Sequence, residues 1–117
     1  MALTSVTNGT LSLSGAVGTE TNMATTTPGA ATTYVYAVDV AALASGEVLF
    51  IRVYVFLLAS GTERMAYFGS VVGGQDTDLI QYSVPIPVNT GTSITIRGTL
   101  HQKNGTGRSF PWQLYSL

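Results

Sequence analysis

The chain has 117 residues, which is enough for one domain and too few for two ordinary ones. Five Lys and Arg stand against six Asp and Glu, and the net charge of −1 offers no basic surface for phosphate groups, so nucleic-acid binding is not expected. The absence of cysteine excludes disulfide bonds and thiolate chemistry.

The first part of the chain, residues 1–33, has a composition of its own. It holds a single charged residue, Glu20, and no aromatic residue. We expect an extended N-terminal arm over residues 1–33 that becomes ordered against a neighbouring subunit. A floppy terminus or weak strands are the alternative, with Leu11 and Leu13 alternating in one short strand and residues 19–26 forming another.

Targeting signals are not evident in this part or later. Residues 1–5 lack the positive region and apolar core of a signal peptide. The longest apolar run, residues 53–59, is far shorter than the ~20 residues that cross a bilayer as a helix. We therefore expect synthesis in a cytoplasm and no membrane partner.

The first clear strand is predicted over residues 33–40, where apolar and other residues alternate. A single helical turn over residues 40–44 follows, and Asp39 is placed to cap it by accepting hydrogen bonds from backbone N–H groups. One face of the predicted strand carries Tyr34, Tyr36, Val38 and Val40.

The most informative segment is the strand predicted over residues 47–57, because both of its faces are apolar. A strand with one solvated face should alternate apolar with polar residues. We expect one face to belong to the core and the other to meet a neighbouring subunit, with Glu63 and Arg64 as candidate partners for Arg52. The core face carries Leu49, Ile51, Val53, Val55 and Leu57, and the other carries Val48, Phe50, Arg52, Tyr54 and Phe56.

Further strands are predicted to the end of the chain. A hairpin loop at residues 59–62 leads into a strand over residues 63–72, with Met65, Tyr67 and Val71 on one face. A short strand over residues 79–84 ends at Pro85, because proline cannot donate to a ladder. The last two strands cover residues 93–102, with Ile94, Ile96 and Leu100 inward, and 109–117, with Phe110, Trp112 and Leu114 on one face.

These elements predict a single all-β sandwich. About seven or eight short strands separated by turn residues, with hardly any helix, are typical of that architecture. A jelly roll is the preferred arrangement and an immunoglobulin-like sandwich the second, since the Cys…Trp…Cys signature is absent. We expect the sandwich domain to span residues 34–117, behind the arm of residues 1–33.

Catalytic chemistry is not expected. His101 is the only histidine and is predicted on the polar face of a strand, without a nucleophile elbow in the chain. Asp76 and Asp78 could supply oxygen ligands to Ca²⁺, but two carboxylates fall short of an EF-hand loop and a solvated turn is preferred. Residues 105–108 lack the Gly-Lys-Ser/Thr ending of a phosphate loop. We predict no catalytic residue, no metal and no cofactor.

The aromatic residues favour protein contact instead. Tyr and Trp bring a large area with a polar handle to cores and interfaces, and Arg is enriched at interfaces. Stacking on sugar rings, as in carbohydrate-binding modules, is the alternative. The predicted interface with a neighbouring subunit or another protein consists of Phe50, Arg52, Tyr54, Phe56, Arg108 and Trp112.

Three stretches of the chain, within residues 34–54, 62–67 and 97–112, carry distinctive motifs. They read Tyr34-Val35…Val38-Asp39…Ala42-Leu43-Ala44-x-Gly46-Glu47 with Leu49…Ile51-Arg52-Val53-Tyr54, Thr62-Glu63-Arg64-x-Ala66-Tyr67, and Arg97-Gly98-Thr99-Leu100-x-Gln102…Gly105-Thr106-Gly107-Arg108-Ser109-Phe110-Pro111-Trp112. In these motifs the chain resembles small structural proteins of tailed bacteriophages, and the similarity covers roughly residues 34–117.

The resemblance implies a virion component, foremost a capsid decoration (cement) protein. Proteins of this kind commonly form trimers that clamp neighbouring capsomers, often through an extended N-terminal arm. The implied partners are the major capsid protein and further copies of the chain, and the implied location is the capsid surface after synthesis in the host cytoplasm. A carbohydrate- or receptor-binding module and a neck or tail component are the alternatives.

Overall fold

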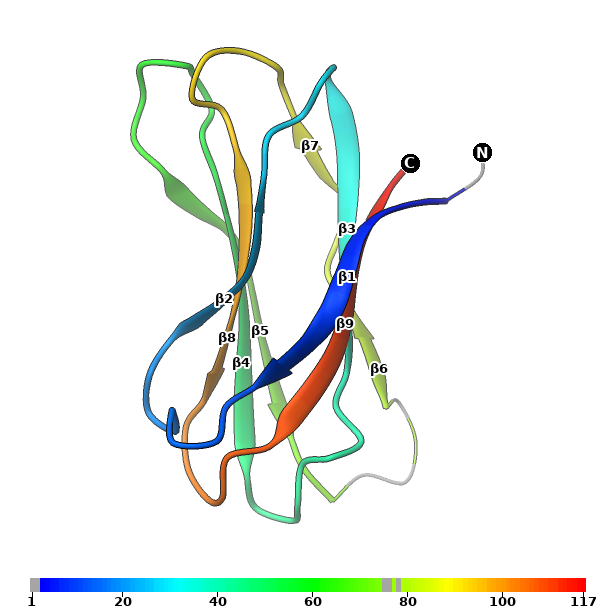
Figure 1. The fold of residues 1–117 in the computed structure, drawn as a ribbon, viewed down its shortest axis with the longest axis vertical. Helices are drawn as coiled ribbons and strands as arrows, with labels where there is room; N and C mark the ends of the chain where they lie inside the picture. The colour runs from blue at the N-terminus through cyan, green and yellow to red at the C-terminus, as the bar shows by residue number, and fades with distance from the viewer. Residues whose placement is uncertain (1–2, 75–76, 78) are drawn as a thin grey trace.

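The computed structural model describes residues 3–74, 77 and 79–117, and within these ranges the chain is all-β without a helix. Two sheets pack face to face, as Figure 1 shows. The prediction of a β-sandwich is confirmed. The strands are β1 (Thr4–Ser12), β2 (Thr21–Thr26), β3 (Thr32–Asp39), β4 (Val48–Val55), β5 (Arg64–Val72), β6 (Ile80–Tyr82), β7 (Ile86–Val88), β8 (Ile96–Gln102) and β9 (Ser109–Ser116).

Neighbouring strands in the chain mostly lie in opposite sheets. One sheet has the order β1-β9-β3-β6, with β7 also paired to β3, and the other has the order β2-β8-β4-β5. Every pairing in the described ranges is antiparallel, and there β4 and β5 form the one hairpin between consecutive long strands. The immunoglobulin-like alternative does not fit, because that fold keeps its first two strands in one sheet whereas β1 and β2 lie in different sheets.

The prediction of an N-terminal arm is wrong for the part of residues 1–33 that the structure describes. β1 pairs with β9 from Thr4 opposite Ser116 to Ser12 opposite Ser109, and β2 pairs with β8. Leu13, just after β1, is fully buried in the core. The alternative of two weak strands is the correct one, because threonine-rich extended segments suit the edges of a sheet even where aromatic residues are absent. The boundary predicted at residues 33 and 34 therefore cuts through the sandwich.

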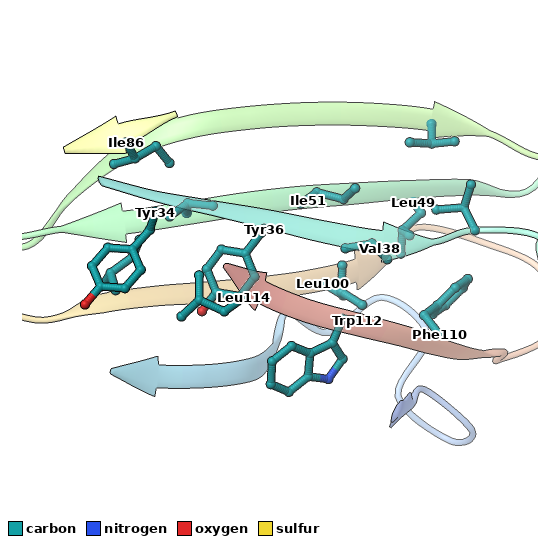
Figure 2. Close-up of a cluster of buried hydrophobic side chains, with 14 of the residues drawn as sticks. Tyr34, Tyr36, Val38, Leu49, Ile51, Ile86, Leu100, Phe110, Trp112 and Leu114 are labelled. Atoms are coloured by element: carbon teal, nitrogen blue, oxygen red, sulfur yellow. The ribbon is translucent and has the colours of Figure 1, made fainter. Parts of the chain in front are cut away.

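The core lies between the two sheets and is built from alternate residues of the central strands. The predicted inward faces of β3, β8 and β9 are confirmed, as are Leu49, Ile51 and Val53 of β4. Figure 2 shows these side chains converging from both sheets. The labelled members of this cluster are Tyr34, Tyr36, Val38, Leu49, Ile51, Ile86, Leu100, Phe110, Trp112 and Leu114.

The alternation predicted for residues 47–57 breaks down at its end. β4 stops at Val55, so Leu57 lies in the following loop with 82% of its surface exposed, and its assignment to the core is wrong. Phe56 instead is partly buried against the core cluster. The two side chains exchange roles because the chain leaves the pleat of the sheet after Val55.

Strand β7 was not expected from the sequence, because it contains Pro87. The proline lies opposite Thr33 in an edge strand, where a missing N–H costs no ladder hydrogen bond. β6 and β7 together pair with the two ends of β3 and are separated by Ser83, Val84 and Pro85.

The predicted cap at Asp39 is confirmed, although the residues after it form a turn and not a helical turn. The backbone N–H of Ala41 donates to Asp39 Oδ1 at 3.0 Å, and that of Leu43 donates to the carbonyl of Val40 at 3.1 Å. Asp39 therefore fixes the exit of β3.

Candidate functional site

The outward side of the four-stranded sheet carries a continuous cluster of aromatic and charged side chains. β4 lies in the middle, so its outward residues are flanked on both sides. Phe50 lies between His101 of β8 and Ser70 of β5, and Arg52 lies between Thr99 and Phe68. We call the group Phe50, Arg52, Tyr54, Phe68 and His101 the aromatic face.

The centre of the aromatic face is a stacked arrangement around Arg52. Its guanidinium carbon lies 5.3 Å from the ring centre of Phe50 and 5.4 Å from that of Phe68. The two rings are 5.4 Å apart, and His101 meets Phe50 edge-on at 5.5 Å. Arg52 also donates a hydrogen bond of 3.2 Å to His101 Nδ1, which must accept because a guanidinium has no acceptor. These contacts hold the Arg52 guanidinium over the rings.

One acid, Glu20, joins β2 and β4 across this sheet. Its Oε2 accepts hydrogen bonds from the Tyr54 hydroxyl at 2.6 Å and from Thr99 Oγ1 at 2.5 Å, and lies 3.9 Å from Arg52. Burial raises the pKa of Glu20, but the hydrogen bonds from Thr99 and Tyr54 and the positive charges of Arg52 and Arg97 outweigh it and lower that pKa overall. Glu20 is the acidic partner of Arg52, so the expectation of Glu63 was wrong.

Glu63 pairs with a different arginine. Arg97 binds its carboxylate through two hydrogen bonds of 3.1 and 2.8 Å, donates to Asn22 at 2.8 Å, and lies 4.3 Å from the ring centre of Tyr54. The hydrogen bond with Glu63 raises the pKa of Arg97. Arg97 and Glu63 are therefore held in place by each other at this end of the aromatic face.

The edge strand β5 leaves apolar side chains in solvent beside the aromatic face. Met65, Phe68 and Val72 are 52%, 48% and 49% exposed, and among the described strands β5 has a neighbour on one side only. The prediction that Met65 shares a face with Tyr67 and Val71 is wrong, because the register with β4 shifts between Val53 and Tyr54, so that Tyr54 pairs with Met65. The inserted residue turns Met65 to the outer side. A strand pattern alone does not reveal a bulge.

Three other predicted interface residues belong to the interior or to an internal ion pair. Trp112 is 9% exposed, lies 6.3 Å from the ring centre of Tyr36 and covers Gly9, so its assignment to the interface is wrong. Arg108 binds Glu47 through two hydrogen bonds of 3.0 Å. Phe56 packs against the core. The structure therefore brings together Phe50, Arg52 and Tyr54 but not Phe56, Arg108 or Trp112.

The Glu47–Arg108 pair ties the loop after β8 to the start of β4. Glu47 is 6% exposed and also accepts hydrogen bonds from the N–H groups of Ala44 and Thr106. The hydrogen bonds from Arg108 and from Ala44 lower the pKa of Glu47 to about 2. The pair is a structural clamp at one end of the sandwich.

The described part of the chain holds no cluster of three or more His, Asp or Glu that could bind a metal ion. Asp76 and Asp78, the candidate calcium ligands, lie outside the described residues. Within the same limits, no helix is long and apolar enough to cross a membrane.

Comparisons of the chain with protein-family models, with curated proteins and with solved structures found no match.

Proposed function

We propose that the protein is a structural virion protein that decorates a phage head by binding the lattice of the major capsid protein. The observation that carries this proposal is the apolar edge of β5. Met65, Phe68 and Val72 are exposed along one strand, and the Phe68 ring lies against Arg52. Exposed apolar side chains at an unpaired strand edge mark a site for association.

The chemistry of this surface matches a protein partner. Aromatic residues, Met and Arg are enriched at protein interfaces, and Phe50, Arg52, Met65 and Phe68 supply these types in one patch. The unpaired edge of β5 can also accept a strand from the partner. A protein that binds only the assembled shell stabilises it by mass action.

The strand order supports the same proposal. We infer a jelly roll, because consecutive strands alternate between the sheets β1-β9-β3-β6 and β2-β8-β4-β5. Jelly rolls occur in viral capsid proteins and in lectins. The wider proposal includes self-association, expected as a trimer, a location on the capsid surface, and no enzymatic activity or cofactor. Since β1 and β2 pair within the chain, the clamp on neighbouring capsomers is assigned to β5 and not to an arm.

Quantitative mass spectrometry of purified particles tests this proposal. A decoration protein is present in a copy number close to that of the major capsid protein. A neck or tail component is present in a small fraction of that number. We expect a copy number per particle close to that of the major capsid protein. Absence from the particles, or the low copy number of a neck protein, would contradict capsid decoration.

A further inference from the structure

The sheet opposite the aromatic face contains a hollow that the proposed capsid contact does not use. It lies over Ala37, in the middle of β3, where the small side chain leaves space between larger neighbours. Gln113 of β9 and Tyr82 of β6 lie opposite Ala37 on either side. The hollow has a volume of about 300 Å³ and is lined by Ala37, Asp39, Ile80, Tyr82, Pro111, Trp112, Gln113 and Tyr115. Figure 1 shows β3 between β9 and β6 in this sheet.

The walls of the hollow combine flat apolar surface with polar groups at the rim. Tyr82 is 59% exposed, and Ile80 is 45% exposed beside it. Neither the Tyr82 nor the Tyr115 hydroxyl has a hydrogen-bond partner among the described residues. These two hydroxyl groups are available to a ligand.

Two further polar side chains are held in place, and each keeps one oxygen that can accept a hydrogen bond from a ligand. One oxygen of Asp39 accepts the bond from Ala41, and the other accepts none from the described part of the chain. The Gln113 amide nitrogen donates to Ser5 at 2.6 Å, which fixes the amide, and its oxygen accepts no bond from a described residue. A preformed set of this kind needs little ordering when a ligand binds.

We propose that this hollow binds a pyranose sugar of neutral or cationic character. Sugar rings offer an apolar face of C–H groups, which suits the ring of Tyr82, and hydroxyl groups that donate to a carboxylate. Asp39 is the one charged residue among the described lining residues, so it repels an acidic sugar. The volume lies at the low end for ligand sites and matches one or two rings.

A proline-rich peptide fits the hollow less well. Polyproline recognition uses an extended groove that accepts residues along a helix with three residues per turn. Here the hollow is centred on one small residue, Ala37, between Tyr82 and Gln113. The sugar site is also independent of the capsid contact, because it lies on the other sheet.

The test is a titration of the full-length protein followed by two-dimensional NMR of its backbone amides. The probes are the methyl glycosides of glucose, galactose, mannose and N-acetylglucosamine, with glucosamine, N-acetylneuraminic acid and a proline-rich peptide as separate arms. The proposal expects at least one neutral or cationic sugar to shift the resonances of Tyr82, Gln113 and Tyr115, and N-acetylneuraminic acid not to shift them.

Variants then locate the site. Ala37→Leu fills the hollow from an outward position, and Tyr82→Ala removes the ring; each should weaken binding by about tenfold or more. Asp39→Asn keeps the acceptor for Ala41 and should weaken glucosamine binding most. Leu58→Ser, an exposed loop position, is the matched control and should bind as the parent does. Binding that survives Ala37→Leu, binding of the peptide alone, or no binding by any sugar would overturn the proposal.

Discussion

The ring of Tyr36 occupies the space that a side chain at Gly98 would need. A Cβ atom placed on Gly98 would lie 2.5 Å from the Tyr36 ring and 2.9 Å from Met23. The Tyr36 hydroxyl donates to the carbonyl of Ala24 at 3.2 Å, so the ring spans from β3 across β8 to β2. Burial raises the pKa of Tyr36 to about 12, which keeps the hydroxyl a donor at all ordinary pH values.

Replacement of Gly98 by alanine should therefore destabilise the sandwich. The added methyl group forces the buried Tyr36 ring or the backbone to move, and overpacking of this kind costs about 2 kcal/mol. The measurement is the free energy of unfolding in urea. Gly29→Ala is the matched control, because nothing lies within 4 Å of its Cβ position, and should change the free energy by less than about 0.5 kcal/mol. Equal effects of both variants would contradict this packing.

The Glu47–Arg108 clamp should make stability depend on acid pH. The pKa of Glu47 falls from 4.5 to about 2 in the folded protein, so the carboxylate stabilises the fold fully above pH 4.5. That contribution is lost as the pH falls from about 4.5 to about 2. Urea unfolding across this range should show a steeper loss of stability in the parent than in Glu47→Gln. Parallel curves for the two proteins would refute the clamp.

Trp112 should behave as a core residue and Phe68 as a surface residue. Trp112→Ala opens a cavity next to Tyr36 and should lower the free energy of unfolding by about 3 kcal/mol or more. Phe68→Ala removes a ring that is 48% exposed and should cost about 1 kcal/mol or less. Thermal and urea unfolding of both variants provide the comparison, and a reversal of this order would show that Trp112 is not buried in solution.

Period-two alternation was sufficient to predict most of the core. Tyr36, Leu49, Leu100 and Leu114 all face inward as the sequence indicates. The prediction failed where a local irregularity changed the face on which a side chain lies. One is the bulge that turns Met65 outward, and the other is the end of β4 before Leu57. Such events depend on pairing with a neighbouring strand, which a single sequence does not display.

The candidate site could be predicted only in part, because some of its residues come together through the pairing of strands. Phe50, Arg52 and Tyr54 share one face of one strand, so the alternation of β4 alone brings them together. Phe68 joins them only through the register of the β4–β5 hairpin, and Glu20 through the pairing of β2 with β8. The low aromatic and charge content of residues 1–33 concealed two edge strands, because edge strands need few core residues.

The central claim is that the β5 edge and the adjoining aromatic face attach the protein to a capsid. Its most direct test is a binding titration of the full-length protein on capsid shells prepared without it. The double variant Met65→Ser/Phe68→Ser should lose about tenfold or more in affinity while unfolding at a urea concentration close to that of the parent. Leu58→Ser should bind as the parent does. Undiminished binding of the double variant, or no binding of the parent, would contradict the claim.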